Sequence, residues 1–170
     1  MNTILARWNS LASLDAAREV LPCCGSQAWA EELVTMRPFE NAASLFTASD
    51  AVWLTLPEAA WQEAFDSHPR IGQHHATQAT AESLQWSQQE QRTALSPDAA
   101  AKFALEEANR RYEERFGRIF IVCASGKSAG EILTILEARM GNDAATELHE
   151  AAEQQRLITQ LRLRRWLGGE

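Results

Sequence analysis

The chain has little of several features that mark particular classes of protein. Its 170 residues include only 3 cysteines, 5 prolines and 8 glycines. Two cysteines are adjacent and the third stands alone, so no spacing indicates a disulfide framework or a zinc site. No apolar run approaches the roughly 20 residues that cross a bilayer, so we expect no membrane association. The N-terminus lacks a basic region followed by an apolar stretch and so is not typical of a signal peptide. The three cysteines suggest buried thiols in a reducing compartment, and we therefore expect a cytoplasmic protein.

Positive charge is also scarce. Lys and Arg number 16 against 23 Asp and Glu, which gives a formal net charge of -7. This balance disfavours nucleic acid as a partner, because phosphate binding depends mainly on Lys and Arg. The chain is otherwise 45% hydrophobic and 23% charged, as is ordinary for a globular protein. Its length fits one domain over residues 1–170 with a substantial core.

Helical periodicity runs through nearly the whole chain, so we predict an all-α fold: a single-domain helical bundle of about eight to nine helices. The predicted helices include one from Leu14 that stops at Pro22, one capped by Ser26, one from about Thr80 to Leu95, one from Ala99 to Phe116 that Gly117 ends, one opened by a Ser128–Glu131 capping box, and a last one capped by Asn142.

One run has the chemistry of a strand. It consists of β-branched, aromatic and other apolar residues: Ile119, Phe120, Ile121, Val122 and Cys123. No second run of this kind is available to pair with it. We therefore predict a buried extended segment near 119–124 instead of a sheet.

The first candidate for chemistry is His68-Pro69-Arg70-Ile71-Gly72, which follows a predicted helix. Pro69 disfavours helical backbone at the residue before it, so His68 is expected at a rigid corner off the helix. A side chain that titrates near neutral pH on such a corner suits proton transfer. The alternative is a helix terminator with an exposed histidine.

Two further places put polar side chains on apolar helix faces. Ser87 and Gln91 share one face with Leu84 and Leu95, and Glu90 lies on its flank. Buried polar groups are costly unless they are paired, so this face either contacts a ligand or is a wet edge.

The second of these places is on the predicted last helix. Arg162 lies four residues from both Ile158 and Trp166. Its guanidinium either binds an acceptor or reaches solvent along its own stem.

Taken together, four motifs resemble those of one family. His68-Pro69-Arg70-Ile71-Gly72, Ser87-x-x-Glu90-Gln91, the run Phe120–Ala124 and Leu161-Arg162-Leu163 occur in the order and spacing of the OHCU decarboxylases. These enzymes act on 2-oxo-4-hydroxy-4-carboxy-5-ureidoimidazoline (OHCU) in urate breakdown. The likeness extends from about Trp8 to Leu167.

The resemblance implies an all-helical, cofactor-free and usually dimeric enzyme that releases CO2 and yields (S)-allantoin. Some members carry a fused hydroxyisourate hydrolase domain or a C-terminal peroxisomal signal. The sequence shows neither, so we expect a stand-alone enzyme. The resemblance also assigns roles: His68 as catalytic acid/base with Glu90 as its catalytic partner, and as substrate-binding residues Pro69, Ser87, Gln91, Phe120, Ile121, Val122, Cys123, Ala124 and Arg162.

Two other functions stay open at the level of sequence. The chain could be a helical module that binds a partner protein through its polar patch. It could also be a metal-dependent hydrolase that uses His68, His74 and His75. Adjacent histidines point in different directions and no His-x-x-x-His spacing supports them, so we expect no metal.

Overall fold

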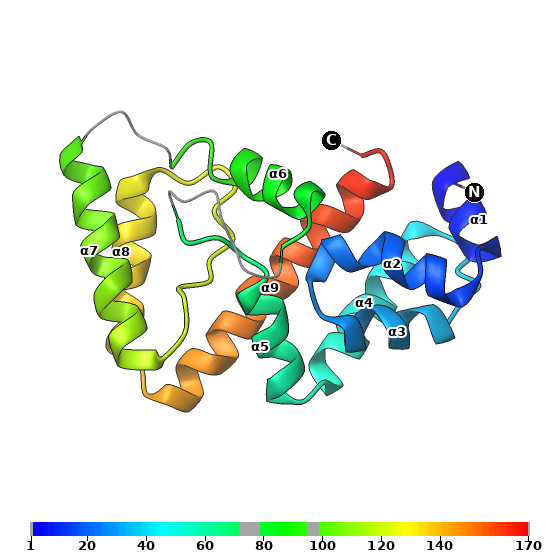
Figure 1. The fold of residues 1–170 in the computed structure, drawn as a ribbon, viewed down its shortest axis with the longest axis horizontal. Helices are drawn as coiled ribbons and strands as arrows, with labels where there is room; N and C mark the ends of the chain where they lie inside the picture. The colour runs from blue at the N-terminus through cyan, green and yellow to red at the C-terminus, as the bar shows by residue number, and fades with distance from the viewer. Residues whose placement is uncertain (1, 72–78, 95–98, 170) are drawn as a thin grey trace. The chain divides into compact units, whose positions relative to one another are not determined.

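The computed structural model describes residues 2–71, 79–94 and 99–169 (Figure 1). These residues form nine α-helices and no strand, which confirms the all-α prediction. The helices are α1 (Thr3–Ser10), α2 (Ser13–Cys24), α3 (Gln27–Thr35), α4 (Ala42–Thr55), α5 (Glu58–Asp66), α6 (Ala81–Glu90), α7 (Ala99–Phe116), α8 (Ala129–Arg139) and α9 (Ala144–Trp166). No helix in the described ranges is long and apolar enough to span a bilayer.

Several helix ends follow from local chemistry, as predicted. Ser26 caps α3 by accepting from the Trp29 amide. Ser128 and Glu131 form a capping box at the start of α8, which satisfies two amides that helical bonding leaves over. Gly117, with φ 69°, ends α7 in the left-handed region that glycine adopts without strain. The segment 119–124 lies outside the helices and is mostly buried, as predicted.

Three predicted boundaries were wrong. The helix α2 continues through Pro22 to Cys24 and ends at Gly25, whose φ is 87°. Pro22 lacks one helical N–H donor, and the helix continues for only two residues beyond it. The helix α6 ends at Glu90 instead of near Leu95, a residue outside the described ranges.

The third correction concerns the start of α9. Asp143, not Asn142, accepts from the Thr146 amide at 2.8 Å. The Asn142 side chain instead donates to the carboxylate of Glu147, at 3.0 Å. The side chain of Asn142 therefore bonds to Glu147, and the neighbouring Asp143 caps α9 in its place.

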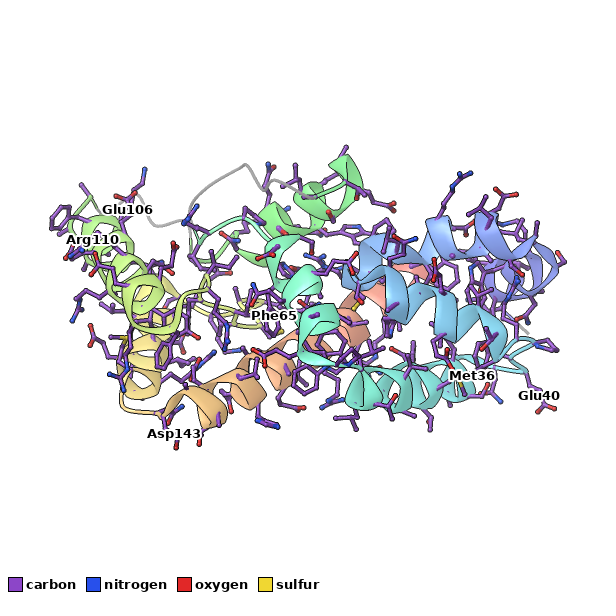
Figure 2. All side chains as sticks on the ribbon, turned by 60° about the horizontal axis from the view of Figure 1, so that its bottom comes forward. Met36, Glu40, Phe65, Glu106, Arg110 and Asp143 are labelled. Carbon is purple, nitrogen blue, oxygen red and sulfur yellow. The ribbon has the colours of Figure 1, made fainter. Side chains whose placement is uncertain are left out.

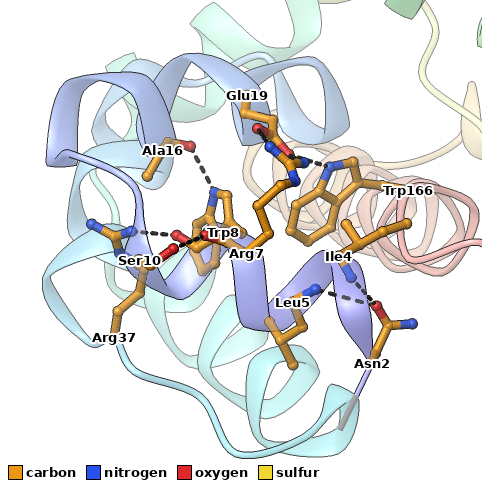
Figure 3. Close-up of polar contacts among 10 residues, drawn as sticks. All are labelled: Asn2, Ile4, Leu5, Arg7, Trp8, Ser10, Ala16, Glu19, Arg37 and Trp166. Carbon is orange, nitrogen blue, oxygen red and sulfur yellow. Dashed lines mark hydrogen bonds and ion pairs between the residues drawn. The ribbon is translucent and has the colours of Figure 1, made fainter.

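The chain packs as two compact units. Unit 1 comprises Met1–Ala64 with Arg156–Glu170, and unit 2 comprises Phe65–Gln155. The core of unit 1 includes Trp8, which is fully buried. Its indole donates to the Ala16 carbonyl at 2.9 Å, and its ring meets Trp166 edge-on at 5.6 Å between centroids (Figure 3). Arg37 lies over the same ring at 5.1 Å.

Unit 2 has its own core between α7 and α8. Tyr112, Ile132 and Leu136 are fully buried at its centre. Phe120 and Val122 of the extended segment pack into the same cluster, so the segment is part of the core and not a surface loop. Charged side chains such as Glu106 and Arg110 lie on the solvent side of α7 (Figure 2).

Candidate active site

His68 lies on a turn directly after α5. Its amide donates to the Phe65 carbonyl at 3.1 Å, and the backbone then leaves the helical conformation. Pro69 is buried, and Ile71 belongs to the core of unit 2. The predicted corner is therefore confirmed, and it presents a half-buried imidazole on a turn held by the apolar residues that follow it.

Arg70 anchors this turn to α7. Its guanidinium makes a two-pronged pair with Glu113, at 2.5 Å for Nε to Oε1 and 2.8 Å for Nη2 to Oε2. The hydrogen bonds to Glu113 raise the pKa of Arg70 above its ordinary value. The Arg70 side chain is 48% exposed, so the pair contributes no more than about 1 kcal/mol to stability. The main effect of the pair is to hold the turn that carries His68 against α7.

The imidazole has a partner that the motifs did not indicate. His68 Nε2 lies 2.6 Å from Oε1 of Gln155, a residue 87 positions away on α9. Gln155 is fully buried. Its position offered a sequence clue, since it lies seven residues before Arg162 and three before Ile158, on the same helix face.

The buried face of α6 is polar. The buried residues of this helix are Ser83, Ser87 and Glu90, and Gln91 at its C-cap is also buried. Glu90 is only 7% exposed, so it belongs to the buried face and not to the flank where the sequence placed it. Leu84 is only half-buried. Three of the predicted site residues, Ser87, Glu90 and Gln91, are thus brought onto one face.

The extended segment is held by its backbone. The Ile121 carbonyl accepts from Arg139 at 2.7 Å. The Cys123 N–H donates to the side chain of Gln154 at 3.0 Å, and the Cys123 carbonyl accepts from the side chain of Lys127 at 2.8 Å. Within the described residues, no hydrogen-bond partner is present for the backbone N–H groups of Val122 and Ala124. Both residues are buried, and buried amides are seldom left unpaired.

A buried ionic cluster supports that segment. Arg139 and Glu147 pair at 2.5 Å, with side chains 6% and 0% exposed. The Tyr112 hydroxyl donates to the same carboxylate at 2.5 Å. Burial and the hydrogen bond to Glu147 raise the pKa of Tyr112 above its ordinary value, so the phenol stays protonated. Arg139 also lies 4.5 Å from the centre of the Phe120 ring. The cluster therefore fixes the backbone that carries the predicted substrate contacts.

Arg162 belongs to unit 1, where it is almost completely buried at 1% exposure. Its Nη1 donates to the Pro22 carbonyl at 3.2 Å. This carbonyl lies in the last turn of α2, where helical bonding leaves carbonyls without donors. Burial raises the pKa of the nearby Cys24 thiol to about 12, and the positive charge of Arg162 opposes this rise. Cys24 is therefore a neutral thiol.

The structure thus groups the predicted residues by segment: His68 with Pro69, Ser87 with Glu90 and Gln91, and the run 120–124. The contact between His68 and Glu90 stays a prediction. His74 and His75, which a metal site with His68 would require, lie outside the described residues. Among the described residues, no three His, Cys, Asp or Glu side chains are grouped so that they could hold a metal ion.

Similarity to known proteins extends over most of the chain. The family model described as OHCU decarboxylase matches residues 9–164. The chain belongs to the OHCU decarboxylase family. It is 34% identical over 129 residues to the 2-oxo-4-hydroxy-4-carboxy-5-ureidoimidazoline decarboxylase of Amia calva, covering 75% of this chain and 73% of that protein. It also resembles a crystal structure of OHCU decarboxylase in the presence of (S)-allantoin. The TM-score is 0.76 and the identity 33%, covering 88% of this chain and 97% of the other.

A longer plant relative shares the same family region. The chain is 36% identical over 142 residues to the uric acid degradation bifunctional protein TTL of Arabidopsis thaliana. The match covers 83% of this chain but spans only 44% of the plant protein. The similarity to the family therefore concerns one part of that bifunctional protein.

Proposed function

We propose that this protein decarboxylates OHCU to (S)-allantoin in urate degradation. The match of the OHCU decarboxylase family model across residues 9–164 carries the proposal. The half-buried imidazole of His68 and the polar buried face of α6 support it, because decarboxylation needs a placed proton donor in a site that excludes most water.

The reaction balances without a cofactor. The carboxylate of OHCU is attached to the carbon next to a C=N bond. When the bond to the carboxylate breaks, its electron pair moves into the C=N system, CO2 leaves and the ring nitrogen takes up a proton. A second proton then adds to the carbon that bears the ureido group, while the 4-hydroxyl group loses one and becomes a carbonyl. One proton is consumed for each CO2 released.

We assign roles to the residues as the family resemblance implies. His68 delivers the proton and Glu90 supports its charged form, since a nearby carboxylate stabilises an imidazolium. Ser87, Gln91 and Arg162 bind polar groups of the substrate, and Pro69 forms part of its pocket. The remaining contacts come from the backbone of residues 120–124. The backbone N–H groups of Val122 and Ala124, both buried residues, support this assignment, since they are suitable donors for the ring carbonyl and the ureido group.

The contributions of these groups are large enough to account for catalysis of the decarboxylation. Holding the reacting groups in place accounts for about 7–11 kcal/mol of a barrier. A placed general acid adds about 10²–10⁴-fold in rate. Neither contribution needs a metal or an organic cofactor, and we propose that the enzyme uses none.

We further propose that the enzyme is a cytoplasmic homodimer. The family resemblance supports the dimer. Within the described residues Cys23, Cys24 and Cys123 form no disulfide, which is compatible with a reducing compartment. Light scattering coupled to size-exclusion chromatography measures the dimer directly, and a monomer mass at all accessible concentrations would contradict it.

The function is tested with purified protein and freshly made OHCU. We expect CO2 release that depends on substrate, together with a circular dichroism signal of one allantoin enantiomer, because the enzyme protonates one face of a planar carbon. Proton addition in free solution has no such preference. A helical interaction module would release no CO2 above the uncatalysed rate, and that result would refute the proposal.

A further inference from the structure

The fully buried side chain of Gln155 contacts the imidazole ring of His68. Its Oε1 lies 2.6 Å from His68 Nε2. An amide oxygen accepts hydrogen bonds but cannot donate them, so the proton of this bond belongs to the imidazole nitrogen. In the neutral ring, the hydrogen atom is then on Nε2 and the lone pair is on Nδ1.

The element that carries Gln155 is rigidly held. Gln155 lies two turns after Glu147 on the same face of α9. Glu147 is fully buried and receives hydrogen bonds from Arg139, Tyr112 and Asn142. Ala151, between the two residues on that face, is also fully buried, so this part of α9 is packed into unit 2. The amide oxygen is therefore presented from a fixed point.

A neutral acceptor suits this task better than a second carboxylate would. A carboxylate at Nε2 would hold the ring in its charged form, whereas an amide favours Nε2–H in both the neutral and the charged ring. His68 then changes protonation state without any change in its bond to Gln155. Turnover requires both states, since the ring must give up a proton and take up another.

We infer that Gln155 is a positioning residue that keeps the proton of neutral His68 on Nε2, so that Nδ1 is the nitrogen that exchanges a proton with the substrate. The inference rests on the proposed decarboxylase function. The imidazolium donates its Nδ1 proton to the substrate and is left neutral, with Nε2 still bonded to Gln155. Nδ1 then takes a proton from solvent before the next turnover.

The first test is independent of activity. Two-dimensional ¹⁵N–¹H spectra of the histidine rings distinguish the tautomers, because Nε2 couples to both ring C–H protons and Nδ1 mainly to one. The chain has 4 histidines, and the His68 signals are those missing from His68→Asn. We expect the protonated nitrogen of the neutral ring to be Nε2. A ring protonated on Nδ1 in the wild-type enzyme would overturn the inference.

The second test uses two substitutions of Gln155. Gln155→Met keeps the length of the side chain and removes the acceptor, whereas Gln155→Glu keeps an oxygen at that place. For Gln155→Met we expect kcat to fall at least about ten-fold, a part of the effect of a placed acid/base, while KM changes by less than about two-fold. Its His68 nitrogen signals should move toward those of a mixture of tautomers. Gln155→Glu should keep the Nε2–H tautomer and lose less of kcat.

The matched control is Gln160→Met on the same helix. Gln160 is also buried, but its amide donates to the Phe46 carbonyl and to Asp50. We expect it to lower the melting temperature without changing kcat or the His68 tautomer. Equal kcat losses in both Gln155 variants with a wild-type tautomer would overturn the inference. Failure of the wild-type enzyme to decarboxylate OHCU would instead refute the proposed function, and the tautomer result would stand apart from it.

Discussion

The helices α6 and α8 of unit 2 are similar in length and begin with similar caps, yet the centres of their buried faces differ in chemistry. They have 10 and 11 residues, and Thr80 and Ser128 cap their N-termini through side-chain oxygens. The buried residues of α8 are Ala129, Ile132 and Leu136, which are apolar, and Arg139 at its last position, which pairs with Glu147. The buried residues of α6 are Ser83, Ser87 and Glu90.

The difference separates what stabilises unit 2 from what gives it chemistry. Burying Leu136 and Ile132 contributes about 1.5–3 kcal/mol each relative to exposure. Burying serine and glutamate costs free energy unless hydrogen bonds replace those to water. The buried face of α6 therefore contributes less to stability than the apolar centre of the buried face of α8. The face fits a role in binding a polar ligand.

The largest effect on activity is expected from a substitution of His68. Replacing it with Asn removes the titratable group and keeps a polar side chain of similar size. We expect kcat to fall by about 10²–10⁴-fold, because a placed acid/base is lost. The melting temperature should change little. Steady-state kinetics and thermal unfolding measure both, with His149→Asn, an exposed histidine of α9, as the control. Unchanged turnover in His68→Asn would remove the residue from the mechanism.

In the apolar face of α8, the substitution Leu136→Ala should lower the stability of the protein without lowering kcat. Leu136 is fully buried in the core between α7 and α8. We expect the free energy of unfolding to fall by about 2–5 kcal/mol, measured by urea denaturation, because a cavity replaces packed methyl groups. The same change at Leu54, which is 66% exposed, should cost no more than about 0.5 kcal/mol. A loss of kcat in the fully folded Leu136→Ala enzyme would break the division between the two helices.

Arg162 shows whether the comparison extends to a buried polar group of unit 1. Lysine keeps the charge but lacks the planar fork that binds two acceptors. If Arg162 binds substrate, Arg162→Lys should raise KM by an amount equivalent to about 1.5–3 kcal/mol with little change in melting temperature. Arg156→Lys on the same helix, which removes part of an ion pair with Asp50, is the control and should leave KM unchanged. A lower melting temperature with a normal KM would instead assign Arg162 to the structure, through its bond to Pro22.

A smaller effect is expected within α6 itself, from two serines one turn apart. Ser83 donates to the Thr80 carbonyl at 3.0 Å, which is a local structural contact. Ser87→Ala should raise KM by an amount equivalent to about 0.5–1.5 kcal/mol, since one hydrogen bond to the substrate is lost. Ser83→Ala should leave KM unchanged and lower stability slightly. Equal behaviour of the two variants would mean that the polar face has no preferred contact with substrate.

The smallest effect is expected from chelation. The proposed mechanism uses side chains and backbone amides only, so exhaustive dialysis against a strong chelator should leave kcat and KM unchanged. Activity assays before and after dialysis check this. Activity that disappears and returns with added zinc would favour a metal-dependent enzyme and contradict the cofactor-free proposal.

Sequence reasoning succeeded where the cause of a structural feature is local. The capping box of Ser128, the end of α7 at Gly117 and the departure of His68 from the helix each depend on residues within a few positions. It failed at Pro22, where α2 continues to Cys24, and at Asn142, and both residues make contacts outside their own turn. The Pro22 carbonyl accepts from Arg162, 140 residues away, and Asn142 bonds to Glu147 instead of capping α9.

The same division holds for the site. The order of residue types along the chain determined the family, the all-α fold and the candidate groups His68, Ser87, Glu90 and Gln91, because motif spacing and helical periodicity are properties of the sequence. Only the tertiary structure decided that Glu90 is buried and that Gln155 meets His68 across 87 residues. Contacts between residues so far apart in the sequence depend on how the helices pack. Helix packing depends in turn on the burial of many side chains together, and a short motif does not contain that information.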